Sequence, residues 1–374
     1  MTTRVYLDHN ATTKIRPEVI QVLTDVMATA GNASSIHAAG QKARQTVELA
    51  RKQVSTLVNA APNQIVFTSG GTEADNQVMC DCDPQKTVVS AIEHPAILDS
   101  CPGANQIPVT KQGVVDLDAL DRMLFEIDTP QMVAIMLANN ETGVLQPIRE
   151  ATKIAHSHGA LLHCDAVQAV GKIPVDFDAL GVDTMALTAH KFGGPQGIGA
   201  LIIRDPDTVN CMIRGGGQER GLRGGTESVA HIAALGVTSR IAVERMERYT
   251  NLSEMRDRME TRLKEVAGSL RVFGLGADRL PNTSKLMMPG VSSETQVIAL
   301  DLAGVEVSAG SACSAGRIEP PYVLTAMGVD DKEALCALRI SLGWDTTDGD
   351  IDLLISEWVK IFERATNQHN ARAH

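Results

Sequence analysis

The chain has 374 residues, of which 44% are hydrophobic, 21% charged and 3% aromatic, and its formal net charge is −11 at pH 7. This composition is typical of a globular protein and argues against a disordered or fibrous chain. The acidic balance and the few aromatic residues exclude the basic surface and the stacking platforms of nucleic-acid binding. We therefore expect no nucleic-acid partner and no membrane partner.

The sequence also indicates a compartment. The first residues contain no apolar run of a secretory signal, and the longest stretch without Asp, Glu, Lys or Arg, residues 53–72, is too polar to cross a membrane. The seven cysteines are scattered and odd in number, which fits reduced thiols better than a disulfide framework. We therefore expect a cytoplasmic protein.

Pro17 opens an early helix, and beyond it short β-rich runs alternate with helical patterns. The predicted strands span residues 64–68, 87–91, 132–138, 160–164, 184–188 and 200–203. Helical patterns at 117–126 and 148–158 lie between them. Apolar strands separated by helices are typical of an α/β fold with a mostly parallel sheet that helices cover on both faces.

The last third of the chain has a different pattern. A long charged helical region at 228–264 is the expected bridge to a second domain, and short runs at 284–287, 306–308 and 338–342 then alternate with helices near 295–302 and 348–364. This pattern predicts a smaller α+β domain. We place the large domain at residues 15–255, and we place residues 1–14 and 256–374 in the small domain.

The residues that follow each strand are the first candidates for a site, because ligands gather beyond the carboxyl ends of parallel strands. The turn at 69–72 (SGGT) follows the first predicted strand and begins a helix. Its glycines would let the backbone approach a phosphate at the helix start. The alternative is an ordinary strand–turn–helix connection that Thr72 caps.

A carboxylate and a lysine follow two neighbouring strands. Asp165 comes after the strand at 160–164, and Lys191 comes after the strand at 184–188. Pyridoxal phosphate requires such a pair, because a lysine forms the Schiff base and an acid keeps the pyridine nitrogen protonated. A buried ion pair or two exposed charges is the alternative.

Two further strand ends carry polar residues that would be unremarkable alone. His94 follows the strand at 87–91, and Asn140 lies in a possible turn after the strand at 132–138. A lone histidine is usually a packing residue. The coincidence changes the interpretation, because five strand ends carry Thr72, His94, Asn140, Asp165 and Lys191 in an order suited to one cofactor.

Longer runs extend this pattern along the chain. They are residues 32–37 (NASSIH), 67–73 (FTSGGTE), 93–94 (EH), 139–143 (NNETG), 165–168 (DAVQ), 189–191 (AHK), 215–221 (GGGQERG), 225–227 (GTE), 310–313 (GSAC) and 339–343 (RISLG). With these runs the chain resembles the cysteine desulfurases, pyridoxal-phosphate enzymes of the class V aminotransferase family. The resemblance extends from Tyr6 to the helix after Trp344 and implies a fold-type-I transferase.

The resemblance implies a role for each residue around the cofactor. Lys191 would form the Schiff base, Asp165 would hold the pyridine nitrogen, and Gln168 would contact the phenolic oxygen. His94 would stack on the ring and help to move protons. The residues that would hold the phosphate are Gly71, Thr72, Thr188 and His190. Thr226 is similar to a residue that reaches the phosphate of the other subunit, which implies a homodimer.

The resemblance also implies the substrate and the sulfur chemistry. Asn140 and Arg339 would position L-cysteine, with Arg339 gripping its carboxylate. Cys313 would accept the sulfur as a persulfide, and an acceptor protein such as an iron–sulfur scaffold would then receive it. The length of the segment from Gly310 to Tyr322 is similar to that in the nitrogen-fixation and housekeeping enzymes. Two other readings stay open: a selenocysteine lyase and a catalytically idle sulfur-relay or scaffold homologue.

The remaining cysteines call for no special chemistry. Cys80 and Cys82 lack a matching histidine–cysteine set at zinc spacing, so we expect no metal site. At most of the other positions, apolar neighbours flank the cysteine, which favours a small residue packed in the core. This interpretation covers Cys80, Cys101, Cys164, Cys211 and Cys336.

Overall fold

The computed structural model describes residues 4–309 and 320–372 of the chain. Seven strands form a large sheet in the order β2-β8-β7-β6-β5-β3-β4. Their bounds are β2 (Ile65–Thr68), β3 (Thr87–Ser90), β4 (Asn105–Ile107), β5 (Met132–Ala134), β6 (Leu161–Asp165), β7 (Thr184–Thr188) and β8 (Gly199–Ile203). β8 is antiparallel to both of its neighbours and all other pairs are parallel, so six strands end at the same edge.

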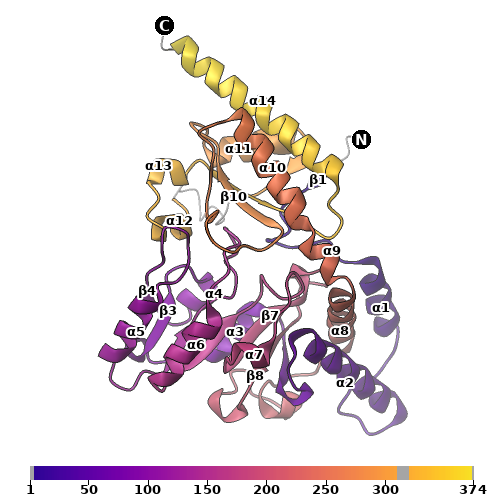
Figure 1. Ribbon diagram of the computed structural model, residues 1–374. Coiled ribbons are helices and arrows are strands. Elements are labelled where there is room, and N and C mark those ends of the chain that lie inside the picture. Colours follow the sequence, from indigo (N-terminus) through magenta and orange to yellow (C-terminus); the bar gives the residue numbers. More distant parts are fainter. Residues whose placement is uncertain (1–3, 310–319, 373–374) are drawn as a thin grey trace.

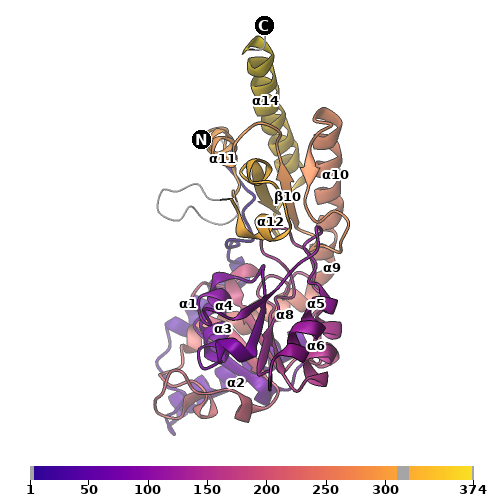
Figure 2. The ribbon, with the colours of Figure 1, turned by 90° about the vertical axis from the view of Figure 1, so that its left-hand side faces the viewer.

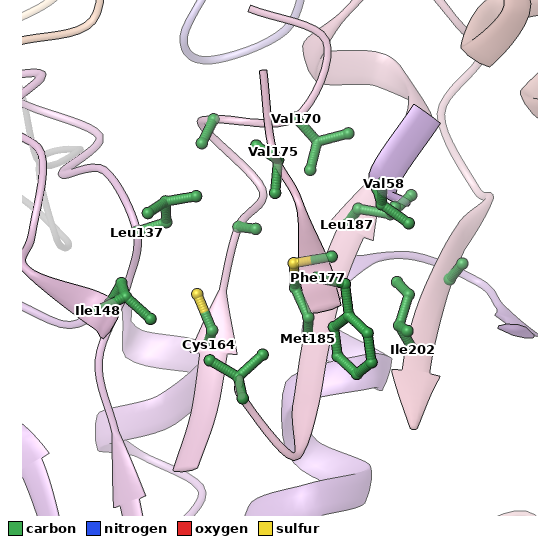
Figure 3. Packing of buried hydrophobic residues seen from close by; sticks show 14 of the residues in the cluster. Val58, Leu137, Ile148, Cys164, Val170, Val175, Phe177, Met185, Leu187 and Ile202 are labelled. Carbon is green, nitrogen blue, oxygen red and sulfur yellow. The ribbon is translucent and has the colours of Figure 1, made fainter. Parts of the chain in front are cut away.

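Helices cover both faces of this sheet. Successive side chains of a strand point to opposite faces and therefore pack into two different cores. In β2, Phe67 packs into the core that includes α2, α5, α6 and α8, whereas Val66 packs with α3 and α4. Figure 3 shows the first core around Phe177 and Met185. The helices of this half are α1 (Pro17–Met27), α2 (Ala38–Val58), α3 (Gly71–Met79), α4 (Pro95–Leu98), α5 (Leu117–Glu126), α6 (Ile148–Ser157), α7 (Phe177–Leu180) and α8 (Val229–Glu244).

A second, smaller group of elements lies on the carboxyl-edge side of the large sheet (Figures 1 and 2). Three antiparallel strands have the order β12-β10-β9, and β1 pairs in parallel with β11. The strands are β1 (Val5–Tyr6), β9 (Arg271–Val272), β10 (Thr283–Met287), β11 (Val305–Glu306) and β12 (Ala337–Ser341). The helices are α9 (Met246–Thr250), α10 (Leu252–Val266), α11 (Ser293–Leu302), α12 (Tyr322–Ala326), α13 (Asp331–Ala334) and α14 (Asp348–Arg372).

The structure confirms the predicted α/β class and corrects several details. The edge strand β4 was missed because its sequence, Asn-Gln-Ile, lacks the apolar run of a central strand. β5 ends at Ala134 rather than at residue 138, although Leu137 still donates a backbone hydrogen bond to Asp165. The helical region at 228–264 is divided into α8, α9 and α10. The domain boundary near residue 255 stays a prediction.

No helix in the described ranges combines the length and the apolar character that a membrane span requires.

Candidate active site

A cavity of about 1040 Å³ lies between the carboxyl edge of the large sheet and the smaller group of elements. One wall consists of residues that follow the strands β2, β3, β5, β6 and β7. The facing wall includes α11, the residues around Ser308, and Arg339 of β12. We use the terms cofactor wall and substrate wall for these two sides.

Ten of the twelve predicted site residues line this cavity. They are Gly71, Thr72, His94, Asn140, Asp165, Gln168, Thr188, His190, Lys191 and Arg339. Thr226 is exposed and does not line the cavity of its own chain among the described residues. Cys313 lies outside the described residues.

The turn between β2 and α3 forms a cradle at the edge of the cavity. A Cβ atom at Gly71 would come within 2.7 Å of Cγ2 of Val167, so the close approach of the two segments requires a glycine. Glu73 accepts a hydrogen bond from the Ser69 backbone N–H at 2.8 Å and pairs with Arg223. The free N–H groups at the start of the nine-residue α3 suit a phosphate.

Asp165 is the carboxylate at the end of β6. Burial, followed by the nearby charge of Asp75, raises its pKa to about 7, while the hydrogen bond from the Val167 backbone N–H favours the charged form. Asp75 lies 3.1 Å from Nε2 of the buried His163, and burial raises the Asp75 pKa to about 8. A positive charge in the cavity would stabilise the ionised form of Asp165.

Lys191 follows β7 in a short 3-10 turn, Ala189–Lys191. Its Nζ donates hydrogen bonds to the backbone oxygens of Asn10 at 2.6 Å and Ala11 at 2.9 Å. Burial, and then the charge of Arg339, lowers the pKa of Lys191 to about 8. A usable fraction of neutral amine therefore exists near neutral pH.

His94 is held by the start of α4. Its Nδ1 accepts a hydrogen bond from the Ala96 backbone N–H at 3.1 Å, so a neutral ring carries its proton on Nε2. Burial lowers its pKa, which favours that neutral ring. The ring lines the cavity with Asp165 and Lys191, where it can exchange a proton with a ligand.

Asn10 and Ala11, in the segment before α1, also line the cavity and were missed as site residues. The backbone oxygen of Asn10 accepts hydrogen bonds from Lys191 and from Nε2 of Gln168. Gln168 also accepts one from the buried Lys172, which fixes the direction of its amide. The segment stands more than 150 residues from Gln168 in the sequence, so no local spacing predicts these contacts.

Arg339 of the substrate wall meets Asn140, which follows β5 on the cofactor wall. Arg339 Nη2 donates to Asp8 Oδ1 at 2.6 Å, and Nη1 donates to the backbone oxygen of Asn140 at 3.2 Å. Within the described part of the chain, Arg339 Nε and Asn140 Oδ1 are buried without a hydrogen-bond partner. Buried polar atoms of this kind favour a polar ligand in the cavity.

These residues fit pyridoxal phosphate. The cradle at Gly71 suits a phosphate, Asp165 suits a protonated ring nitrogen, and Lys191 offers an amine of lowered pKa. The unpartnered atoms of Arg339 and Asn140 remain for the substrate. No group of three or more His, Cys, Asp or Glu side chains in the described ranges could hold a metal ion.

The structure refines the interpretation of the other cysteines. Cys101 and Cys164 are buried as expected, and Cys211 and Cys336 are half-buried. The core interpretation is wrong for Cys80, which is exposed at the end of α3.

Comparisons with known proteins agree with this site. The Aminotransferase class-V family model matches residues 5–354, so the fold and the site define a member of that family. The chain is 39% identical to the IscS-like cysteine desulfurase of Mycobacterium tuberculosis over 369 residues, covering 93% of each chain. It is 36% identical to the cysteine desulfurase NifS of Azotobacter vinelandii, covering 97% of this chain and 94% of the relative.

Solved structures lead to the same group. A NifS-like protein from Rickettsia africae matches with a TM-score of 0.89 at 36% identity, covering 96% of this chain and 99% of that one. A structure of SspA in complex with cysteine matches with a TM-score of 0.78 at 28% identity, covering 90% and 98%. The chain therefore belongs to the cysteine desulfurases of the class-V aminotransferase family.

Proposed function

We propose that this chain is a pyridoxal-phosphate-dependent cysteine desulfurase. In the overall reaction, L-cysteine and the thiol of Cys313 give L-alanine and a persulfide on Cys313. The observation that carries this proposal is the meeting of Asp165, Lys191 and Arg339 around one cavity. A sulfur relay without its own chemistry would need only the cysteine, and a selenocysteine lyase would use nearly the same residues.

The cofactor wall would hold pyridoxal phosphate. Gly71, Thr72, Thr188 and His190 all line the cavity, and the phosphate would lie among them near the start of α3. Asp165 would pair with the ring nitrogen, and Gln168 Nε2 would face the phenolic oxygen. When bound, the cofactor supplies an electron sink that weakens the bonds at the substrate Cα.

Lys191 would move the proton at the substrate Cα. Its amine is held by two backbone oxygens of the segment at Asn10 and Ala11, and its pKa of about 8 makes it a base near neutral pH. His94 would carry a second proton at Nε2. Both groups face the cavity, where a bound substrate would lie within their reach.

Arg339 of the substrate wall and Asn140, across the cavity, would orient L-cysteine. Arg339 Nε has no partner in the described chain and suits the substrate carboxylate, while the ion pair with Asp8 holds the guanidinium in place. Asn140 Oδ1 would accept a hydrogen bond from the same substrate. This arrangement leaves the sulfur end of the substrate for Cys313.

Assembly and partners belong to the same proposal. We propose a cytoplasmic homodimer in which Thr226 contacts the phosphate bound by the partner. Support comes from the exposure of Thr226 and from exposed apolar side chains such as Ile36 and Ile213. The persulfide sulfur would pass to an acceptor protein, with an iron–sulfur scaffold as the expected kind.

The test is a turnover assay with the purified protein loaded with pyridoxal phosphate. We expect alanine and enzyme-bound sulfur in equal amounts from L-cysteine, and alanine production at least ~100-fold slower in the Lys191→Ala variant. A selenocysteine lyase would turn over selenocysteine and leave L-cysteine unused. An idle homologue would bind no cofactor and lack its visible absorption band. Either of the last two results would overturn the proposal.

A further inference from the structure

Two lysines are fully buried beside the cavity, and the proposed function assigns a direct role to neither. Lys172 and Lys285 are both 0% exposed. Lys172 Nζ donates to Gln168 Oε1 at 2.7 Å and to Asn10 Oδ1 at 2.8 Å, so it supports the cofactor wall. Lys285 lies on the opposite side, in β10, and supports the substrate wall.

Lys285 joins two parts of the cavity lining from behind. Its Nζ lies 2.9 Å from Oε2 of Glu141, which is also 0% exposed, and donates to the backbone oxygen of Ala309 at 3.0 Å. Glu141 and Ala309 both line the cavity. Glu141 follows Asn140 in the loop after β5, so one buried ammonium group connects the large sheet with the small one.

The register of the small sheet explains why this lysine needs a partner. Lys285 and Arg339 are directly opposite each other in the antiparallel pair β10–β12, so both side chains lie on the same face. Two like charges at such positions destabilise a sheet. Asp8 pairs with Arg339 and Glu141 pairs with Lys285, so each cation has its own carboxylate.

Stability alone gives a weak reason for the Lys285–Glu141 pair. Removing two charges from water costs so much that well-packed apolar residues of similar volume are often at least as stabilising. What an apolar side chain could not do is hold the backbone oxygen of Ala309. A buried ammonium group that pairs with a carboxylate and also donates a hydrogen bond to a backbone oxygen is suited to fixing the position of that backbone.

Ala309 belongs to the segment before Cys313; we call residues 308–309 the stem. Ser308 and Arg339 exchange two backbone hydrogen bonds, with N···O distances of 3.2 and 2.7 Å. Together with the bond from Lys285 to Ala309, these contacts fasten residues 308–309 to the strands that carry the substrate arginine. Cys313 stands four residues after Ala309 in the sequence.

We propose that Lys285 is a positioning residue for the sulfur transfer: through Glu141 and Ala309 it holds the stem before Cys313 against the substrate wall. This inference rests on the proposed function. Loss of Lys285 slows the transfer of sulfur from substrate to Cys313 and spares the earlier steps at the cofactor. Loss of Lys172, whose contacts lie on the cofactor wall, instead affects the steps at the cofactor and spares the transfer of sulfur to Cys313.

The test compares two rates in the loaded enzyme mixed rapidly with L-cysteine. One is the change in the visible absorbance of the bound cofactor, and the other is the appearance of persulfide on Cys313, trapped by alkylation and located by mass spectrometry. For Lys285→Met we expect the first rate within twofold of wild type and the second at least tenfold slower. Lys172→Met is the matched control, because it should shift the absorbance of the bound cofactor.

A second variant guards against a folding defect. Lys285→Met/Glu141→Gln removes both charges and leaves no unpaired buried ion, and we expect it to show the same separation of the two rates. Equal slowing of both rates, no slowing of either, or loss of cofactor from both Lys285 variants would overturn the inference and leave Lys285 a structural residue. A wild-type enzyme that forms no persulfide would overturn the proposed function and this inference with it.

Discussion

The two walls of the cavity are built in different ways. On the cofactor wall, each candidate residue stands within a few positions of a strand end, and parallel strands bring these ends together. On the substrate wall, Arg339 is held by an ion pair with Asp8, which is 331 residues away in the sequence. Local motifs thus encode the first wall, whereas long-range ion pairs assemble the second.

This difference predicts distinct consequences of mutation. A substitution on the cofactor wall should impair the chemistry or the binding of the cofactor. A substitution on the substrate wall should leave the cofactor bound and impair the use of the substrate. The predictions below run from the largest expected effect to the smallest.

Lys191→Ala should have the largest effect. Loss of a positioned base lowers rates by about 10²–10⁴-fold, and no other amine follows β7 to replace this one. The fold should survive, because within residues 4–309 and 320–372 the Lys191 amine donates only to two backbone oxygens. Alanine production and the circular dichroism spectrum check the two statements. Turnover at the wild-type rate would remove Lys191 from the mechanism.

Arg339→Ala should lower kcat/KM for L-cysteine by roughly 10- to 100-fold, since hydrogen bonds to a charged group contribute about 1.5–3 kcal/mol. The absorbance of the bound cofactor should not change. Steady-state kinetics and a cofactor titration test both parts. If the variant loses the cofactor instead, the separation between the two walls fails.

In the cofactor-free proteins, the free energy of unfolding should differ between wild type and Asp165→Asn by an amount that depends on pH. The pKa of Asp165 is raised to about 7 in the fold, above the usual value near 3.9, so the folded state binds more protons than the unfolded state between these values. The wild type therefore loses stability as the pH rises from about 4 to 7. Asp165→Asn lacks this loss and should gain about 1–4 kcal/mol relative to wild type across that window.

Denaturant unfolding of both cofactor-free proteins at several pH values measures this difference. A difference that stays constant from pH 4 to 8 would contradict the raised pKa of Asp165. Adding pyridoxal phosphate should reduce the difference, because an opposite charge beside Asp165 stabilises its ionised form.

Gly71→Ala should have the smallest effect. The added methyl group would meet Cγ2 of Val167 at 2.7 Å and push the cradle away from a phosphate. Overpacking of this kind costs about 1–2 kcal/mol, which corresponds to roughly 5- to 30-fold weaker binding of pyridoxal phosphate. Val167→Ala should restore part of the affinity in the double variant. Unchanged affinity in the single variant would exclude the cradle as the phosphate site.

The same contrast between the walls explains what the sequence could predict. Motifs after successive strands indicated Thr72, His94, Asn140, Asp165 and Lys191, because strand ends in a parallel sheet are neighbours in space. Resemblance supplied Arg339 and Gln168. Asp8, Lys172 and Lys285 escaped prediction because their roles arise from burial and from partners distant in sequence.

The fold shows a similar limit. Central strands were predictable because they are buried on both faces and read as apolar runs, while the polar edge strand β4 was not. The division of the region 228–264 into three helices also escaped prediction, because helical periodicity alone does not mark the breaks at Arg245 and Asn251.

The most direct test of the account follows the sulfur atom itself. The loaded enzyme receives one equivalent of L-cysteine without added thiol, and mass spectrometry then locates the extra sulfur while alanine is quantified. We predict one alanine per transferred sulfur, with that sulfur on the peptide containing Cys313, and no bound sulfur in Cys313→Ser although its cofactor still responds to L-cysteine. Transfer to another cysteine, or sulfide release by Cys313→Ser at the wild-type rate, would contradict the account.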